Sequence, residues 1–133
     1  MKTVAMQLLL LCCSVLALAC QDNPKKQVQG MDGISIIDKE DVKTHVIGKE
    51  VQLVDVRTAE EFAAGHIGHA VNYNIIDSQT FLKQIERLDK NKPVYLYCKM
   101  GGRSNRAALL LKENGFTEIY DYSGGYNNWV IEN

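Results

Sequence analysis

Residues 95–104 read YLYCKMGGRS, and this stretch decides the fold. The apolar run from Val94 to Tyr97 contains β-branched and aromatic residues, which is typical of a short buried strand. A cysteine and two glycines follow, and Ser104 then opens a helical run over residues 105–114. A strand, a tight loop and a helix start bring successive backbone N–H groups together at the positive end of a helix dipole. The stretch therefore predicts an anion-binding loop.

Cys98 lies at the centre of this predicted loop. A field that attracts anions also favours a thiolate over a thiol, and the thiolate is the nucleophilic form of cysteine. Arg103 follows five residues later and offers a fixed positive charge for an anionic substrate. Cys98 and Arg103 are therefore the candidate catalytic residues. The alternative interpretation of Cys98 is an inert buried cysteine.

The length and charge of the chain exclude some classes of protein. A chain of 133 residues allows one domain. Its net charge is -1 and no stretch of basic residues is visible, so a nucleic-acid partner is not expected.

The N-terminus resembles a bacterial lipoprotein signal. Residues 1–19 begin with a positive charge at Lys2 and contain an apolar core that is too short to span a bilayer. Small residues precede Cys20, although Ala17 stands where such signals usually carry leucine. We expect removal of residues 1–19, lipid attachment to Cys20 and a polar tether over residues 20–33. The protein is then exported and anchored by this lipid to a bacterial membrane, on its periplasmic side. An ordinary secretory signal, which gives a soluble periplasmic or secreted protein, is the alternative.

The number of cysteines limits the kinds of site that the chain can form. Two of the four cysteines leave with the signal and Cys20 carries lipid, so Cys98 is the one free thiol expected in the mature chain. A disulfide within the chain and a zinc site built from several cysteines are then excluded. His66 and His69 have no cluster of other ligands at metal-binding spacing. We expect no metal and no cofactor.

Strand and helix patterns alternate along residues 34–133, which we expect to form one domain. Strands are expected at residues 34–37, 51–56, 70–75, 94–97 and 118–122. Helices are expected at residues 39–46, 59–65, 80–88 and 105–114 and around Trp129, with Asp38 and Thr58 as N-caps. This alternation predicts an α/β fold, an open and mainly parallel sheet with helices on both faces. Ligands of such sheets bind at the carboxyl ends of the strands, where Cys98 and Asp55 lie.

Three segments of the chain together resemble the rhodanese family of sulfurtransferases. They are LVDVR at residues 53–57 with EEF at 60–62 and GHI at 65–67, YC at 97–98 through RS at 103–104, and GG at 124–125 with Trp129. Each segment is weak alone, but all three in this order form a specific signal that covers residues 34–129. One departure is His69, where the family usually has glycine.

The resemblance implies a rhodanese-like fold in which Cys98 accepts a sulfur atom as a persulfide. Its thiolate would attack the outer sulfur of thiosulfate or a similar donor, and cyanide or a thiol would then collect that sulfur. The expected partners are a small anionic sulfur donor, a thiol or cyanide acceptor, and a protein that delivers or collects sulfur. The expected substrate-binding residues of the loop are Lys99, Met100, Gly101, Gly102 and Ser104.

Loop length separates this chemistry from that of the cysteine phosphatases. Those enzymes place five residues between cysteine and arginine, whereas four separate Cys98 from Arg103 and Ser104 holds the later position. The shorter loop suits a sulfur atom rather than a phosphoryl group. A second hypothesis is a non-catalytic module of the same fold, which acts as a sulfur carrier or binds other proteins. Such modules commonly lose the cysteine, and this chain retains it.

Asp55, Arg57 and Glu61 are expected to support the loop rather than to react. Asp55 ends a strand near Cys98, and we expect its carboxylate to cap neighbouring amides. We expect Arg57 to pair with Glu60 or Glu61 and so to brace the loop from behind.

Overall fold

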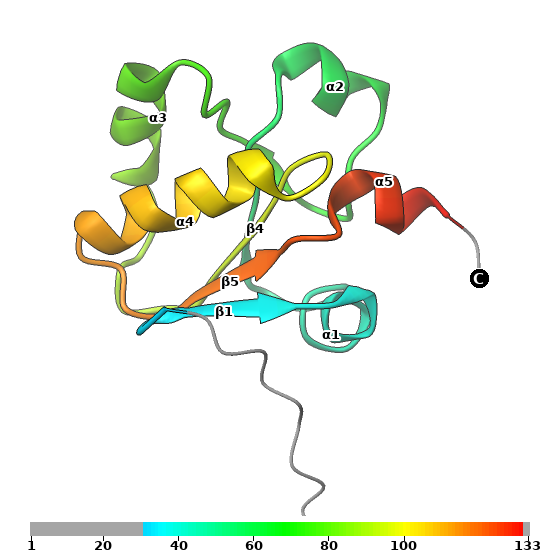
Figure 1. Ribbon diagram of the computed structural model, residues 1–133, viewed down its shortest axis with the longest axis horizontal. Helices are drawn as coiled ribbons and strands as arrows, with labels where there is room; N and C mark the ends of the chain where they lie inside the picture. Colours follow the sequence, from blue (N-terminus) through cyan, green and yellow to red (C-terminus); the bar gives the residue numbers. More distant parts are fainter. Residues whose placement is uncertain (1–30, 132–133) are drawn as a thin grey trace, which may run out of the picture.

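The computed structural model describes residues 31–131 of the chain (Figure 1). The expected signal sequence, Cys20 and the first part of the expected tether lie outside these residues. The elements follow in the order β1 (Ile34–Ile37), α1 (Lys39–His45), β2 (Gln52–Asp55), α2 (Ala59–Ala64), β3 (Val71–Asn72), α3 (Ser78–Ile85), β4 (Val94–Tyr97), α4 (Gly102–Glu113), β5 (Ile119–Tyr122) and α5 (Gly125–Val130). No helix within the described range is long and apolar enough to cross a bilayer.

The strands form one five-stranded parallel sheet in the order β1-β5-β4-β2-β3. The strand that carries Cys98 at its end, β4, lies at the centre, between β5 and β2. Leu96 of β4 is aligned with Val54 on one side and with Asp121 on the other. The nearly continuous hydrophobicity of β2 predicts burial on both faces, and Leu53 and Val54 are indeed both buried. The predicted open, parallel α/β fold is confirmed.

Helices cover both faces of the sheet, and each face has its own hydrophobic core. One core contains Cys98 and the buried side chains of α3 and α4, namely Phe81, Ile85, Ala107, Ala108 and Leu111. The other core contains Tyr97 and side chains from α1, α2 and α5, namely Val42, Phe62, Tyr126 and Trp129. Successive residues of β4 therefore point to opposite cores, as the alternation of a strand requires.

Capping side chains fix the first residues of two helices. Asp38 and Thr58 both form the expected capping boxes, in which each side chain accepts a backbone N–H three residues later. In the second box the Thr58 N–H also donates to Oε2 of Glu61 at 3.0 Å. This bond fixes Glu61 in the first turn of α2. The helix ends where predicted, at Gly65, whose φ is 155°.

Three elements differ from the prediction by more than one residue at a boundary. The expected strand at residues 70–75 shortens to β3, because the chain leaves the ladder and the side chains of Tyr73 and Ile75 enter the core. Helix α3 begins earlier than expected because Asp77 caps it, accepting the Thr80 N–H at 3.1 Å. Helix α4 also begins earlier, since its N-cap is Gly101.

Candidate active site

The site lies where β4 ends and the chain turns into α4 (Figure 1). Cys98 follows β4 directly and is 1% exposed, so its sulfur lies at the floor of the loop. Gly101 has a φ of 101°, in the left-handed region that favours glycine, and this conformation closes the loop in four residues. The loop therefore places the thiol directly against the start of a helix twelve residues long.

Two polar groups from this turn face the Cys98 sulfur. The Gly101 N–H donates to Sγ at 3.0 Å, and Oγ of Ser104 lies 3.6 Å from Sγ. The Ser104 hydroxyl, itself fully buried, donates to the Gly101 carbonyl at 3.1 Å. An amide N–H and the positive end of the α4 dipole both stabilise negative charge on sulfur. The arrangement suits an anionic sulfur, either a thiolate or a persulfide.

The start of α5 holds the same loop from the other side. The Tyr126 N–H donates to the Cys98 carbonyl at 2.8 Å, and the Asn127 N–H donates to the Lys99 carbonyl at 3.1 Å. These bonds depend on the close approach of Gly125, whose α carbon has no room for a side chain. The glycine pair that the sequence placed before the last helix is thus part of the loop's support.

Arg103 makes a two-pronged ion pair with Glu61. Its Nη1 lies 2.6 Å from Oε2 of Glu61 and its Nη2 lies 2.9 Å from Oε1. Hydrogen bonding from Arg103 lowers the pKa of Glu61 to about 2. The pair therefore stays ionised at all but strongly acidic pH. It fixes the guanidinium at the rim of the loop, with 28% of the Arg103 side chain exposed.

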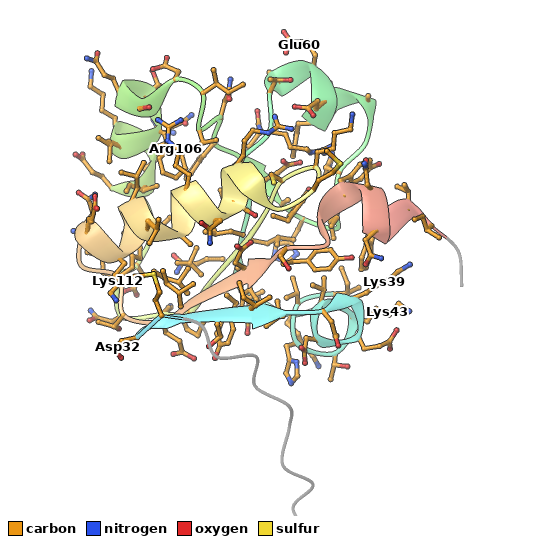
Figure 2. All side chains as sticks on the ribbon, viewed as in Figure 1. Asp32, Lys39, Lys43, Glu60, Arg106 and Lys112 are labelled. Atoms are coloured by element: carbon orange, nitrogen blue, oxygen red, sulfur yellow. The ribbon has the colours of Figure 1, made fainter. Side chains whose placement is uncertain are left out.

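The predicted pairing of Arg57 with Glu60 or Glu61 is wrong. Arg57 is buried and binds Asp55 instead, with Nη2 2.6 Å from Oδ2 and Nε 2.9 Å from Oδ1. It also donates to the Gly65 carbonyl at 2.7 Å. Figure 2 shows Glu60 on the outer side of α2. The carboxylate two residues before Arg57 is the nearer partner, because both side chains project from the same end of β2.

Asp55 caps a backbone amide, as expected, and forms no hydrogen bond with the Cys98 sulfur. Its Oδ1 accepts the backbone N–H of Arg57 at 3.0 Å, in addition to the Arg57 guanidinium. The guanidinium carbon also lies 4.1 Å above the centre of the Tyr126 ring. Asp55 and Arg57 thus join the end of β2 to α5, which in turn holds the loop.

The remaining loop residues line the solvent side. Lys99, Met100 and Gly102 are exposed, and 72% of Met100 is accessible. Their contact with substrate stays a prediction.

The histidines and Arg106 lie outside the site. His66 stacks on Phe62 with ring centres 4.0 Å apart, and His69 contacts the Val51 carbonyl through Nε2 at 2.9 Å. No group of three potential metal-ligating side chains occurs within residues 31–131. Arg106 reaches across to α3, where its Nη2 donates to Oγ of Ser78 at 2.8 Å (Figure 2).

Sequence reasoning missed one polar residue near the loop. Asp121 lies in β5 and is 1% exposed, its Oδ1 has no hydrogen-bond partner among the described residues, and burial raises its pKa to about 6. The available signal was a carboxylate in the middle of an otherwise apolar and aromatic strand, IYDY at residues 119–122.

Known proteins similar to this chain share its sequence features and its fold. Residues 38–132 match the rhodanese-like domain. The uncharacterized protein YqhL of Bacillus subtilis is 43% identical over 81 residues, which are 61% of this chain and 62% of that protein. The thiosulfate sulfurtransferase GlpE of Shewanella oneidensis is 37% identical over 81 residues, 61% of this chain and 77% of that enzyme.

Among solved structures, a rhodanese-like domain protein from Staphylococcus aureus matches with a TM-score of 0.64 and 32% identity. The match covers 73% of this chain and 92% of that one. The chain therefore belongs to the rhodanese-like domain family.

Proposed function

We propose that this protein is a sulfurtransferase that carries a sulfane sulfur on Cys98. The donor is thiosulfate or a similar small anion, and the acceptor is cyanide or a thiol. The observation that carries this proposal is the Gly101 N–H bond to Sγ at the start of α4, which suits a sulfur that is anionic both before and after transfer. The relative from Shewanella oneidensis named thiosulfate sulfurtransferase supports it.

The reaction needs one nucleophile and one site for negative charge. The Cys98 thiolate attacks the outer sulfur of thiosulfate, the S–S bond of the donor breaks, and sulfite leaves with the electron pair. The persulfide formed is an anion, and the Gly101 amide with the α4 dipole stabilises it. An acceptor then attacks the outer sulfur and Cys98 leaves as the thiolate.

Positive charges at the rim guide anionic donors to the loop. Arg103 is held in place by Glu61, and Lys99 of the same loop is exposed and adds a second positive charge. The exposed apolar side chain of Met100 also suits contact with a protein that delivers or collects sulfur. The non-catalytic alternative, a sulfur carrier or interaction module, uses this same rim.

We further propose that the protein is exported and acts on the periplasmic side of a bacterial membrane. Its sequence supports removal of residues 1–19 and lipid attachment to Cys20. Residues 20–33 then serve as the tether between lipid and domain.

The test of the proposed function is the mass of the protein after thiosulfate treatment. The sulfurtransferase gains one sulfur, about 32 Da, because the reaction passes through a covalent intermediate. Peptide mapping places the gain on Cys98, and cyanide removes it rapidly as thiocyanate. A gain that cyanide removes only slowly supports the carrier, whereas no gain at Cys98 rejects both and leaves a binding module.

Replacing Glu61 by glutamine should lower the rate of sulfur transfer between about 10- and 100-fold, because it releases Arg103 from its fixed position. Glutamine retains the capping box with Thr58, so α2 should stay folded. Steady-state rates with thiosulfate and cyanide measure the effect. Glu60→Gln, one residue away on the outer side of α2, is the matched control and should keep the wild-type rate. Equal rates in both variants would show that the ion pair does not position Arg103 for transfer.

A further inference from the structure

Two peptide groups of the active-site loop are oriented by the start of α5. The Tyr126 N–H donates to the Cys98 carbonyl at 2.8 Å, and the Asn127 N–H donates to the Lys99 carbonyl at 3.1 Å. Every peptide bond of the described residues is trans, and in a trans peptide the N–H points opposite to the carbonyl. The N–H groups of Lys99 and Met100, which share these two peptide groups, therefore point away from α5.

The side of the loop that faces away from α5 is the side of the sulfur. The Cys98 side chain belongs to the core beneath α3 and α4, whereas the Tyr126 side chain belongs to the core on the opposite face of the sheet. Within residues 31–131, neither the Lys99 N–H nor the Met100 N–H donates a hydrogen bond. A backbone N–H that has no partner in the protein is available to an anion. The loop therefore offers two donors on the side where Cys98 would carry a transferred sulfur.

The side chain of Tyr126 fixes the position of α5. This helix has six residues and no side-chain N-cap, so its position depends on contacts with the rest of the domain. The Arg57 guanidinium, which is held by the Asp55 carboxylate, lies over the Tyr126 ring with its carbon 4.1 Å from the ring centre. The Tyr126 hydroxyl also lies against the α carbon of Gly65, where an added Cβ would have no room. Tyr126 thus joins the end of β2, through its ring, to the Cys98 carbonyl, through its backbone.

We propose that Tyr126 is a positioning residue for sulfur transfer, whose ring sets α5 so that the α5 amides turn the Lys99 and Met100 N–H groups toward the sulfur on Cys98. This inference rests on the proposed function, because the charge that these two donors face is that of the persulfide. The Gly101 N–H already bonds Sγ itself. Lys99 and Met100 then supply donors for the outer sulfur.

Replacing Tyr126 by leucine should lower the rate of sulfur transfer from thiosulfate to cyanide between about 10- and 100-fold. Leucine keeps an apolar side chain but removes the ring from the Arg57 guanidinium, so α5 and the two peptide groups that it orients should shift. Tyr126→Phe keeps the aromatic ring and loses only the hydroxyl, so it should recover most of that loss. This recovery separates contact with the guanidinium from the hydroxyl group.

Tyr120→Leu is the matched control, since it makes the same exchange at another half-buried tyrosine. The Tyr120 ring stacks on Tyr95 with ring centres 4.8 Å apart, and its hydroxyl donates to Glu118. It makes no hydrogen bond with the active-site loop. Tyr120→Leu should therefore keep the wild-type rate, even if it costs as much stability as Tyr126→Leu.

Amide hydrogen exchange of the full chain, followed by nuclear magnetic resonance, tests the contact without any sulfur donor. In the wild type the Asn127 N–H should be protected and the Met100 N–H should exchange rapidly. In Tyr126→Leu the Asn127 N–H should exchange at least about 10-fold faster relative to the Leu96 N–H of the central strand. The Leu96 N–H reports global unfolding, so this ratio isolates the local opening of the loop from α5.

The same spectra after thiosulfate treatment follow the two donors themselves. In the wild-type persulfide the amide protons of Lys99 and Met100 should move downfield, because each then bonds an anionic sulfur. In the Tyr126→Leu persulfide these shifts should be smaller, and in Tyr120→Leu they should equal those of the wild type.

Wild-type rates in Tyr126→Leu, or equal losses in Tyr126→Leu and Tyr126→Phe, would overturn the proposal. If Tyr126→Leu does not fold, as judged by circular dichroism, the wild type decides. Rapid exchange of its Asn127 N–H, or a persulfide that leaves the Lys99 and Met100 amide protons unmoved, would overturn the proposal. Loss of Asn127 protection in Tyr126→Leu together with no mass gain from thiosulfate would reject the sulfurtransferase and leave Tyr126 as the residue that positions the loop.

Discussion

The Cys98→Ser variant should keep its fold and transfer no sulfur. A serine hydroxyl stays protonated near neutral pH, and oxygen cannot take the place of sulfur as both nucleophile and leaving group. The rate of thiocyanate formation from thiosulfate and cyanide should fall at least about 1,000-fold, to the uncatalysed background. The fold should survive because the Gly101 N–H that now bonds sulfur can bond the serine oxygen.

Cys20→Ser is the matched control, since it also exchanges one cysteine for serine. Cys20 lies outside residues 38–132, which match the rhodanese-like domain, so the rate of sulfur transfer should equal that of the wild type. Under the lipoprotein proposal it should also move the protein from the membrane fraction to the soluble fraction. Wild-type activity in Cys98→Ser would show that Cys98 is not the sulfur acceptor. A Cys20→Ser protein that stays in the membrane fraction would show that lipid on Cys20 is not the anchor.

The parts of this site that the sequence predicts are local in the chain. Cys98, Gly101 and Ser104 lie within seven consecutive residues, so the strand, loop and helix start that they form follow from hydrophobic pattern and glycine placement. The two capping boxes are local in the same way, because each joins residues three positions apart. The alternation of strands and helices then fixes a parallel sheet, and with it the edge at which Cys98 lies.

The parts that the sequence does not predict depend on how distant elements pack. Glu61 and Arg103 are 42 positions apart, and their pairing requires α2 to lie over the start of α4. Arg57 is closer to Glu61 in the sequence and was its predicted partner, but Arg57 binds Asp55 at the end of β2 instead. Both pairings are determined by the positions of the side chains in the folded structure, which no local sequence pattern predicts.

Asp121 illustrates a different limit. In the sequence it is one polar residue in a short strand, and polar residues of strands are usually solvent-exposed. Only the position of β5 between β1 and β4, and the packing of α4 on the sheet, make it a buried carboxyl.

The Gly125→Ala variant should lose about 3 kcal/mol of unfolding free energy or more, from a left-handed backbone and from overpacking together. Gly125 has a φ of 66°, and an added Cβ would lie 2.6 Å from the carbonyl oxygens of both Cys98 and Lys99. These are backbone atoms of the active-site loop, so they cannot move aside as a flexible side chain would. Denaturant unfolding measures this loss. The protein that remains folded should transfer sulfur more slowly, because the active-site loop is displaced.

Gly48→Ala separates the two causes. Gly48 has a similar φ of 71°, but an added Cβ would meet no atom within 4 Å. Its variant should lose only the backbone cost, about 1 kcal/mol, and should transfer sulfur at the wild-type rate. The difference between the two variants is then the cost of pushing α5 away from the loop. Equal losses in both would mean that the loop accommodates a methyl group, and that the contact between Gly125 and the Cys98 carbonyl does not hold the site in place.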